Sequence, residues 1–250
     1  MNDPRTHQHH QRKPNEYIIE GLSVLTEFLR LKPQAVKQVY CHTKHRARVE
    51  AVLSGKRIPL SVVESADRNP LQISKSPVFA CVEIHYQSLQ NLIVELRKGP
   101  KRSLVLALDH ITDPRNLGAI ARSAAFFGVK YILIPKTRQV LLTEASVASS
   151  QGAFAYTELV LVSNLHQALE KLKEENYWVL CADMGGLPYE KATGQYEKCV
   201  LLLGSEGEGV SDLLKRKSDL IISIPPSETI LDSLNVSVAA GILLNAFSKS

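Results

Sequence analysis

Residues 103–128 read SLVLALDHITDPRNLGAIARSAAFFG, and the expected fold follows from how this segment divides. It opens with an apolar run that ends at Asp109, and a helical pattern then runs from Asn116 to a stop at Gly128. An apolar strand joined by a short loop to a helix is the repeating unit of a parallel sheet that helices cover on both faces. The segment therefore predicts one strand–helix unit of an α/β domain.

The same alternation continues to the C-terminus. Strands are expected at residues 129–135, 158–162, 178–183, 198–204 and 219–225, and helices at residues 142–154, 164–177, 210–217 and 237–250. The pattern predicts an α/β domain with a parallel sheet over residues 104–250. Ligands of such sheets bind beyond the carboxyl ends of the strands, so functional residues are expected there.

Residues 16–96 predict a small α/β domain of their own. Its first helix, at residues 20–31, carries Leu22, Leu25 and Leu29 at helical spacing and stops before Pro33. A second helix is expected at residues 47–55, and strands at residues 36–42, 58–63 and 78–86. Residues 97–103, RKGPKRS, predict a linker, and the polar residues 1–15 predict a disordered tail.

Composition excludes several classes of protein. The chain has 250 residues, of which 44% are hydrophobic, and this excludes a disordered or collagen-like chain. No apolar run reaches the roughly 18 residues that a membrane span needs, and the polar N-terminus lacks a secretory signal. The four cysteines are far apart and predict reduced, structural thiols in a cytoplasmic protein. No metal site is expected, because Cys41, His42 and His45 lack a second pair of ligands.

The basic residues are unevenly distributed. The formal net charge is +5, and residues 1–100 hold 15 Lys and Arg against 9 Asp and Glu, whereas residues 101–250 hold 15 against 16. A basic N-terminal part favours a polyanionic partner such as RNA. Charge alone is equally consistent with a basic surface that serves solubility.

Three segments at expected strand ends have unusual composition. The first is residues 113–124, where Asp113 or Asn116 can cap the helix and Arg122 lies four residues after Gly118. Arg122 sits among small and apolar residues on a helix that is expected to be buried, so it needs a partner. That partner is either a ligand or an acid of an internal salt bridge.

The second segment is residues 203–209, LGSEGEG, and the third is Ile224-Pro225 followed by residues 232–241. Glycines at the second segment let a backbone or ligand approach closely, and Glu206 is either a functional acid or a surface turn residue. Ser233 and Asn235 fit a helix N-terminus, as caps or as ligand contacts. The glycine spacing matches neither a dinucleotide fingerprint nor a phosphate-binding P-loop, and no hydrolase or metalloprotease motif occurs.

Together the three segments resemble the motifs of the SpoU (TrmH) family of RNA ribose 2′-O-methyltransferases, most of all the subset that modifies guanosine in 23S rRNA. The resemblance covers residues 103–250 and carries the patterns D-P-x-N-x-G-x-x-x-R-S-A, L-G-S-E-G-x-G and S-L-N-V-S-V-A-A-G. It implies a trefoil-knotted methyltransferase domain. Residues 16–96 more loosely resemble the ribosomal-protein-like RNA-binding domain that precedes it in the rRNA subset.

The resemblance also implies a site and its partners. S-adenosylmethionine is expected against Gly204, Ile224 and Leu234, and the expected catalytic residues are Asn116, Arg122, Glu206, Ser233 and Asn235. Arg122 is expected to clamp a phosphate and stabilise the developing alkoxide, since an arginine does not act as a base. The family's homodimer is expected here too, with the last helix at the interface. The apolar face of that helix is equally consistent with an intrachain core.

The expected function is therefore S-adenosylmethionine-dependent methylation of the ribose 2′-OH of a guanosine in large-subunit rRNA. The alternatives are a tRNA guanosine 2′-O-methyltransferase, a non-catalytic RNA-binding or assembly protein on the same fold, and a methyltransferase that confers antibiotic resistance. One departure from the family pattern stands at residues 226–232, where the loop is one residue longer and lacks glycine. This departure leaves the base preference open.

Overall fold

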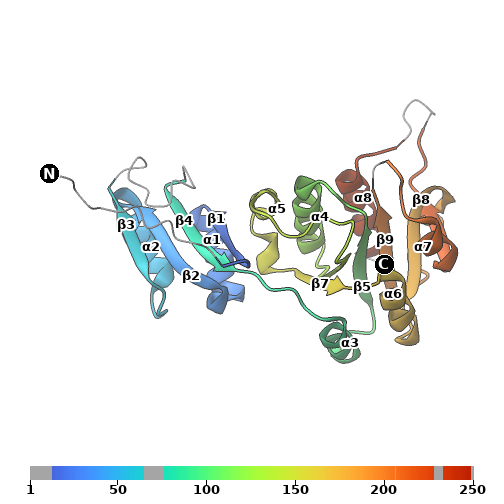
Figure 1. Cartoon of the computed structure of the whole chain (residues 1–250), viewed down its shortest axis with the longest axis horizontal. Helices are drawn as coiled ribbons and strands as arrows, with labels where there is room; N and C mark the ends of the chain where they lie inside the picture. Colours follow the sequence, from blue (N-terminus) through green and yellow to red (C-terminus); the bar gives the residue numbers. More distant parts are fainter. Residues whose placement is uncertain (1–12, 65–75, 206, 228–232, 249–250) are drawn as a thin grey trace. The chain divides into compact units, whose positions relative to one another are not determined.

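The computed structural model describes residues 13–64, 76–205, 207–227 and 233–248 (Figure 1). The chain divides into two compact units, residues 1–84 and residues 85–250. Residues 1–12 of the expected tail lie outside the described residues. Within the residues described, no helix combines the length and the apolar character that a membrane span requires.

The first unit is built on a four-stranded sheet with the strand order β1-β4-β2-β3. Its parts are β1 (Glu16–Glu20), α1 (Leu22–Leu31), β2 (Val36–His42), α2 (Arg46–Leu53), β3 (Leu60–Val63) and β4 (Val78–Glu83), with short 3-10 helices at Pro33–Ala35 and Thr43–His45. β4 is antiparallel to both neighbours, and β2 and β3 are parallel. As the leucine spacing predicts, α1 buries Leu25 and Leu29, and it ends before Pro33.

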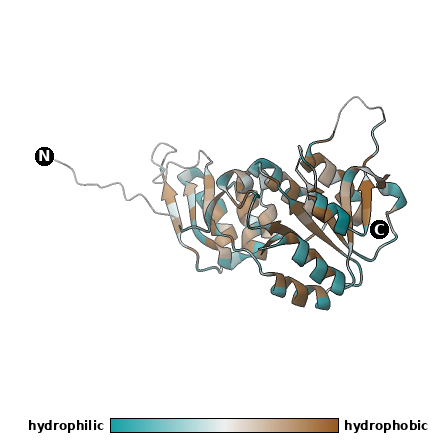
Figure 2. Ribbon diagram, turned by 45° about the vertical axis from the view of Figure 1, so that its right-hand side comes forward, coloured by the Kyte–Doolittle hydropathy of each residue, from teal (hydrophilic) through white to brown (hydrophobic). Residues whose placement is uncertain are grey.

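The second unit is built on a six-stranded sheet with the order β10-β8-β9-β5-β6-β7. The strands are β5 (Ser103–Asp109), β6 (Tyr131–Pro135), β7 (Glu158–Val162), β8 (Trp178–Pro188), β9 (Lys198–Gly204) and β10 (Leu220–Ser223). Every neighbouring pair is parallel, which confirms the predicted sheet. The strands are largely hydrophobic in Figure 2 because both faces of the sheet are covered.

Helices flank this sheet. They are α3 (Leu89–Lys98), α4 (Pro114–Phe126), α5 (Glu144–Ser150), α6 (Leu165–Glu174), α7 (Asp212–Lys217) and α8 (Val236–Ser248), with 3-10 turns at Ala153–Ala155 and Tyr189–Lys191. All but α3 lie within or near the helices that the sequence predicts. The knotted path implied by the resemblance stays a prediction.

The helix α3 was not expected, and it changes where the units divide. Ser88 caps it by accepting a hydrogen bond from the backbone N–H of Asn91 at 3.1 Å. Leu92 and Leu96 are buried in the core of the second unit. Ahead of α3, Gln87 pairs with β7 through two backbone hydrogen bonds of 2.8 and 3.1 Å. The division therefore falls before residue 85, earlier than the linker expected at residues 97–103.

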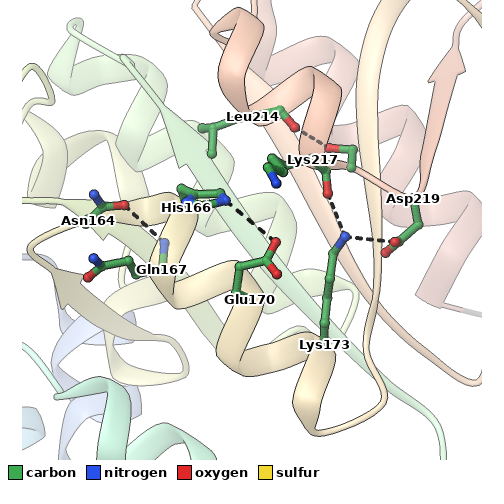
Figure 3. A network of polar contacts seen from close by, with 9 residues as sticks. Asn164, His166, Gln167, Glu170, Lys173, Leu214, Lys217 and Asp219 are labelled. Atoms are coloured by element: carbon green, nitrogen blue, oxygen red, sulfur yellow. Dashed lines mark hydrogen bonds and ion pairs between the residues drawn. The ribbon is translucent and has the colours of Figure 1, made fainter.

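A polar network fixes the end of α7 and the start of β10 against α6 (Figure 3). The ammonium of Lys173 donates to the backbone oxygen of Lys217 at 2.6 Å and to the carboxylate of Asp219 at 2.8 Å. The other carboxylate oxygen of Asp219 accepts the backbone N–H of Val179 at 2.7 Å. These bonds hold the C-terminal end of α7 beside the end of α6 and the start of β8.

The helices α4 and α5 approach so closely that a glycine is needed between them. A Cβ atom on Gly118 would lie 1.9 Å from Oγ of Ser149 and 2.3 Å from the backbone oxygen of Ser146. Those distances are far shorter than any van der Waals contact, so a side chain at residue 118 would push the two helices apart.

We expect Gly118→Ala to lower the free energy of unfolding by about 1–3 kcal/mol or more, because the added methyl overpacks the contact. Chemical denaturation of both proteins measures this difference. The matched control is Gly185→Ala, whose new Cβ meets nothing within 4 Å. Equal stability of Gly118→Ala and the wild type would contradict the steric account.

Candidate active site

The carboxyl ends of β5 and β9 bring the first two motifs together. The two strands pair in register from Ser103 with Lys198 to Asp109 with Gly204. Asp109 is only 4% exposed, and its carboxylate accepts the backbone N–H of Ser211 at 2.8 Å. A buried carboxylate thus fixes the far end of the glycine-rich turn to the end of β5.

The turn that follows β9 is too tight for any residue but glycine at its first position. Ser205 and Gly209 exchange backbone hydrogen bonds of 3.2 and 3.0 Å. A Cβ atom on Gly204 would lie 2.0 Å from the carbonyl carbon of Gly209 and 2.1 Å from the nitrogen of Val210. Glu206, an expected catalytic residue, lies outside the described residues.

A pocket of about 700 Å³ opens beside this turn. The three expected cofactor residues, Gly204, Ile224 and Leu234, all line it, and Ser233 lines it too. Much of the remaining wall is apolar, formed by Met184, Leu203, Ile222, Val236, Ala239 and Leu243. The structure thus gathers the second and third motifs around one largely apolar pocket.

A residue of an ion pair, Asp183, lines this pocket of about 700 Å³. Asp183 lies in the stretch of β8 between the residues that pair with β10, Cys181 and Leu187, and it accepts a hydrogen bond from Lys215 of α7 at 2.5 Å. Partial burial by itself would raise the pKa of Asp183, but the Lys215 ammonium and the backbone N–H of Gly185 outweigh it and hold that pKa below its ordinary value. The carboxylate is therefore ionised at neutral pH. The sequence offered no signal for this pair, because its members are far apart in the chain.

A second, smaller pocket of about 640 Å³ adjoins the first. The two share Ser205, Gly207, Glu208 and Val236. The rest of the smaller pocket comes from the loop after β5, the start of α4 and the loop after β6, with His110, Ile111, Thr112, Asp113, Asn116 and Arg138. Asn116, from the first motif, is thus placed next to the larger pocket.

Asn116 and Asn235 join α4 to the start of α8. The amide nitrogen of Asn235 donates to the side-chain oxygen of Asn116 at 3.2 Å. The side-chain oxygen of Asn235 accepts the backbone N–H of Ser237 at 2.9 Å and its hydroxyl at 2.5 Å. Asn235 therefore serves as a helix cap and also connects the first and third motifs.

Arg122 does not have the surroundings that were expected for it. It is exposed, because α4 buries the opposite face that carries Leu117, Ile120 and Ala121. No acid among the described residues forms an ion pair with Arg122, so the internal salt bridge is not observed there. Arg122 also lies outside the described lining of both pockets. The sequence predicted a buried helix on which Arg122 needs a partner; α4 buries only one face, and Arg122 lies on the exposed one.

The described cysteines and metal-ligand residues can be compared with what a reactive thiol or a metal site requires. All four cysteines are free and buried, and burial raises the pKa of Cys181 and of Cys199 to about 12. Those two thiols therefore stay protonated near neutral pH. Among the described residues, no three His, Cys, Asp or Glu side chains gather as a metal-binding group.

Two residues of the smaller pocket were missed by the sequence analysis. His110 and Arg138 have left-handed backbones, with φ of 61° and 56°. His110 also lies close to the buried acid, since its Nδ1 is 3.6 Å from Oδ1 of Asp109. Residues other than glycine seldom adopt this backbone conformation, and when they do they often belong to functional sites. The sequence does not reveal such a conformation.

Comparison with known proteins identifies the family. Residues 103–245 match the model of the SpoU rRNA Methylase family. A protein of Staphylococcus saprophyticus that is assigned to the TrmH family of tRNA/rRNA methyltransferases is 36% identical over 239 residues, which covers 92% of this chain and 94% of the relative. A tRNA/rRNA methyltransferase of Archaeoglobus fulgidus, itself uncharacterized, is 32% identical over 217 residues, covering 80% of this chain and 94% of that protein.

Solved structures share the fold at lower identity. The SpoU methyltransferase AviRb from Streptomyces viridochromogenes, in complex with AdoMet, has a TM-score of 0.79 at 20% identity and covers 94% of this chain and 90% of that chain. The AdoMet-bound rRNA methyltransferase from Sinorhizobium meliloti has a TM-score of 0.74 at 22% identity and covers 92% and 85%. With the family match over more than half of its length, the chain belongs to the SpoU rRNA methylase family.

Proposed function

We propose that this protein transfers the methyl group of S-adenosylmethionine to the ribose 2′-OH of a guanosine in large-subunit rRNA. The observation that carries the proposal is the pair of adjoining pockets at the carboxyl ends of β5 and β9. One is lined by Gly204, Ile224 and Leu234, and the other by Asn116. Family membership supports the methyl transfer, and the basic first hundred residues support an RNA partner.

The residues of the larger pocket fit S-adenosylmethionine. A volume of about 700 Å³ lies in the usual range for small-molecule sites, and much of the wall is apolar. The closeness of Gly204 to Gly209 leaves backbone, rather than side chain, at the base of the turn. When bound, S-adenosylmethionine supplies a methyl group on a positively charged sulfonium. The Asp183 carboxylate on the pocket wall is already paired with Lys215, so the pocket offers the sulfonium a largely apolar wall rather than an unpaired countercharge.

The chain's own polar residues would prepare the ribose hydroxyl. Asn116 and Asn235 hold each other, and Ser233 lies on the wall of the larger pocket, so these three are proposed to position the ribose. Arg122 is proposed to clamp a phosphate and to stabilise the charge that develops on the 2′-oxygen. A phosphate or another group accepts the proton, because the pKa of an arginine exceeds about 12. Glu206 is proposed to orient Arg122 or its loop.

A homodimer, with a knotted second unit in each protomer, completes the proposal. Arg122 is exposed on α4, and Val238 on the adjacent α8 is 50% exposed. Pairing two copies with α8 at the interface would cover Val238 and bring Arg122 to an assembled site. The inner face of α8, with Leu243, Leu244 and Phe247, is buried within the chain.

Methyl transfer from labelled S-adenosylmethionine to protein-free large-subunit rRNA and, separately, to bulk tRNA tests the proposed reaction. We expect label in rRNA, at a single guanosine whose 3′ linkage resists alkali. Label in tRNA alone would keep the reaction and overturn the substrate. Measurable cofactor binding without label in either RNA would overturn methylation of free RNA, and no cofactor binding would favour a non-catalytic RNA-binding protein.

Gly204→Ala is expected to abolish S-adenosylmethionine binding, since the added Cβ would lie 2.0 Å from the backbone of Gly209. Isothermal titration calorimetry measures the affinity, and circular dichroism establishes that the variant is folded. Gly185→Ala is the control, because its Cβ is free of contacts and it does not line the pocket. Wild-type affinity in a folded Gly204→Ala protein would contradict the assignment of this pocket.

Arg122→Ala is expected to lower kcat by about 10²–10³-fold, because removing one group that stabilises developing charge has an effect of this size. The affinity for S-adenosylmethionine should stay unchanged. Single-turnover methyl transfer measures the rate. Arg115→Ala removes the same charge from α4, where that guanidinium pairs with Asp113, and should keep most of the turnover. Full turnover by Arg122→Ala would remove Arg122 from the mechanism.

A further inference from the structure

Arg138 is held in an unusual backbone conformation at the smaller pocket. It lies on the loop between β6 and α5, is exposed, and has a φ of 56°. A left-handed backbone at a residue other than glycine is strained and persists only where the surroundings impose it. The loop around Arg138 therefore has to be fixed by other contacts.

Those contacts join the loop to the segment after β5. The backbone N–H of Ile111 donates to the side-chain oxygen of Gln139 at 2.7 Å, and the N–H of Val140 donates to the backbone oxygen of Ile111 at 2.8 Å. The hydroxyl of Tyr86 accepts the N–H of Leu142 at 2.8 Å. This clamp keeps Arg138 at the pocket that also contains His110 and Asn116.

The charges of the smaller pocket leave Arg138 available for an anion. Asp113 is engaged by Arg115 through contacts of 2.8 and 3.3 Å. Glu208 lies in the glycine-rich turn that lines both pockets, and it forms no ion pair with Arg138. No acid within the described part of the chain forms an ion pair with Arg138. Arg138 is the arginine among the described residues that line this pocket, since Arg122 does not line it.

We propose that Arg138 binds a phosphate of the RNA backbone beside the nucleotide whose ribose is methylated. This inference rests on the proposed function and adds a substrate-binding residue to it. A guanidinium matches the two oxygens of a phosphate in a fixed geometry. Arg138 lines the smaller pocket and not the one assigned to S-adenosylmethionine, so RNA phosphate is favoured over the cofactor's carboxylate.

Three variants test the role of Arg138. Arg138→Gly removes the guanidinium and adopts a φ of 56° without strain, so the loop is preserved. Arg138→Lys keeps the charge but loses the fork-shaped geometry. Lys136→Ala is the matched control, because it removes a positive charge from the same loop at an exposed residue that lines neither pocket.

The measurements are the Kd for the methylated rRNA at several salt concentrations, the Kd for S-adenosylmethionine, and kcat/KM. For Arg138→Gly we expect roughly tenfold weaker RNA binding, the scale for one charged hydrogen bond, and a salt slope smaller by about 1. The S-adenosylmethionine affinity should stay unchanged. Arg138→Lys should recover part of the RNA affinity, and Lys136→Ala should lose less of it than Arg138→Gly.

Each adverse result has its own meaning. A wild type that methylates no RNA overturns the proposed function. A wild type that methylates rRNA while Arg138→Gly binds it equally well overturns only the role of Arg138. Weaker S-adenosylmethionine binding by Arg138→Gly, with unchanged RNA affinity, would instead assign the guanidinium to the cofactor's carboxylate and overturn the phosphate assignment.

Discussion

The parallel pairing of β5 with β9 is the constraint on which the site depends. These strands are distant in sequence, yet their register places Asp109 opposite Gly204 and so brings the first two motifs to one edge of the sheet. The buried carboxylate of Asp109 then accepts the N–H of Ser211 and so holds the glycine-rich turn after β9 against the end of β5. Both pockets share that turn, so a shift in this register would change their common wall.

Close backbone contact does much of the remaining positioning. Gly204 lies against Gly209, and Gly186 lies so near Ile221 and Ile222 that a Cβ would come within 2.6–2.7 Å of their backbone atoms. The turn beside the larger pocket is thereby shaped by main chain, which varies less in position than long side chains do. Asp183 is a charged residue of the pocket wall, and its ion pair with Lys215 fixes its position.

The sequence predicts the parallel sheet well, because apolar runs and helical spacing are local signals. That ligands bind at the strand ends follows from the pattern alone, whereas the choice of Gly204, Ile224 and Leu234 came from the family resemblance; all three line one pocket. The sequence does not predict features that depend on packing between residues far apart in the chain. The exposure of Arg122 depends on which face of α4 is covered, and the left-handed backbone of Arg138 depends on hydrogen bonds to Ile111. The helix α3 had local signals in Ser88 and its leucine spacing that the linker interpretation overlooked.

The attachment of α3 to the second unit has a practical consequence for producing fragments of the protein. The family match begins at residue 103, but Leu92 and Leu96 cover part of the core beside β7. A fragment cut at residue 103 would expose that apolar surface to water and would also lose the strand-like pairing of Gln87. Such surfaces favour self-association. A fragment with its core intact must start upstream of α3, near the division at residue 85.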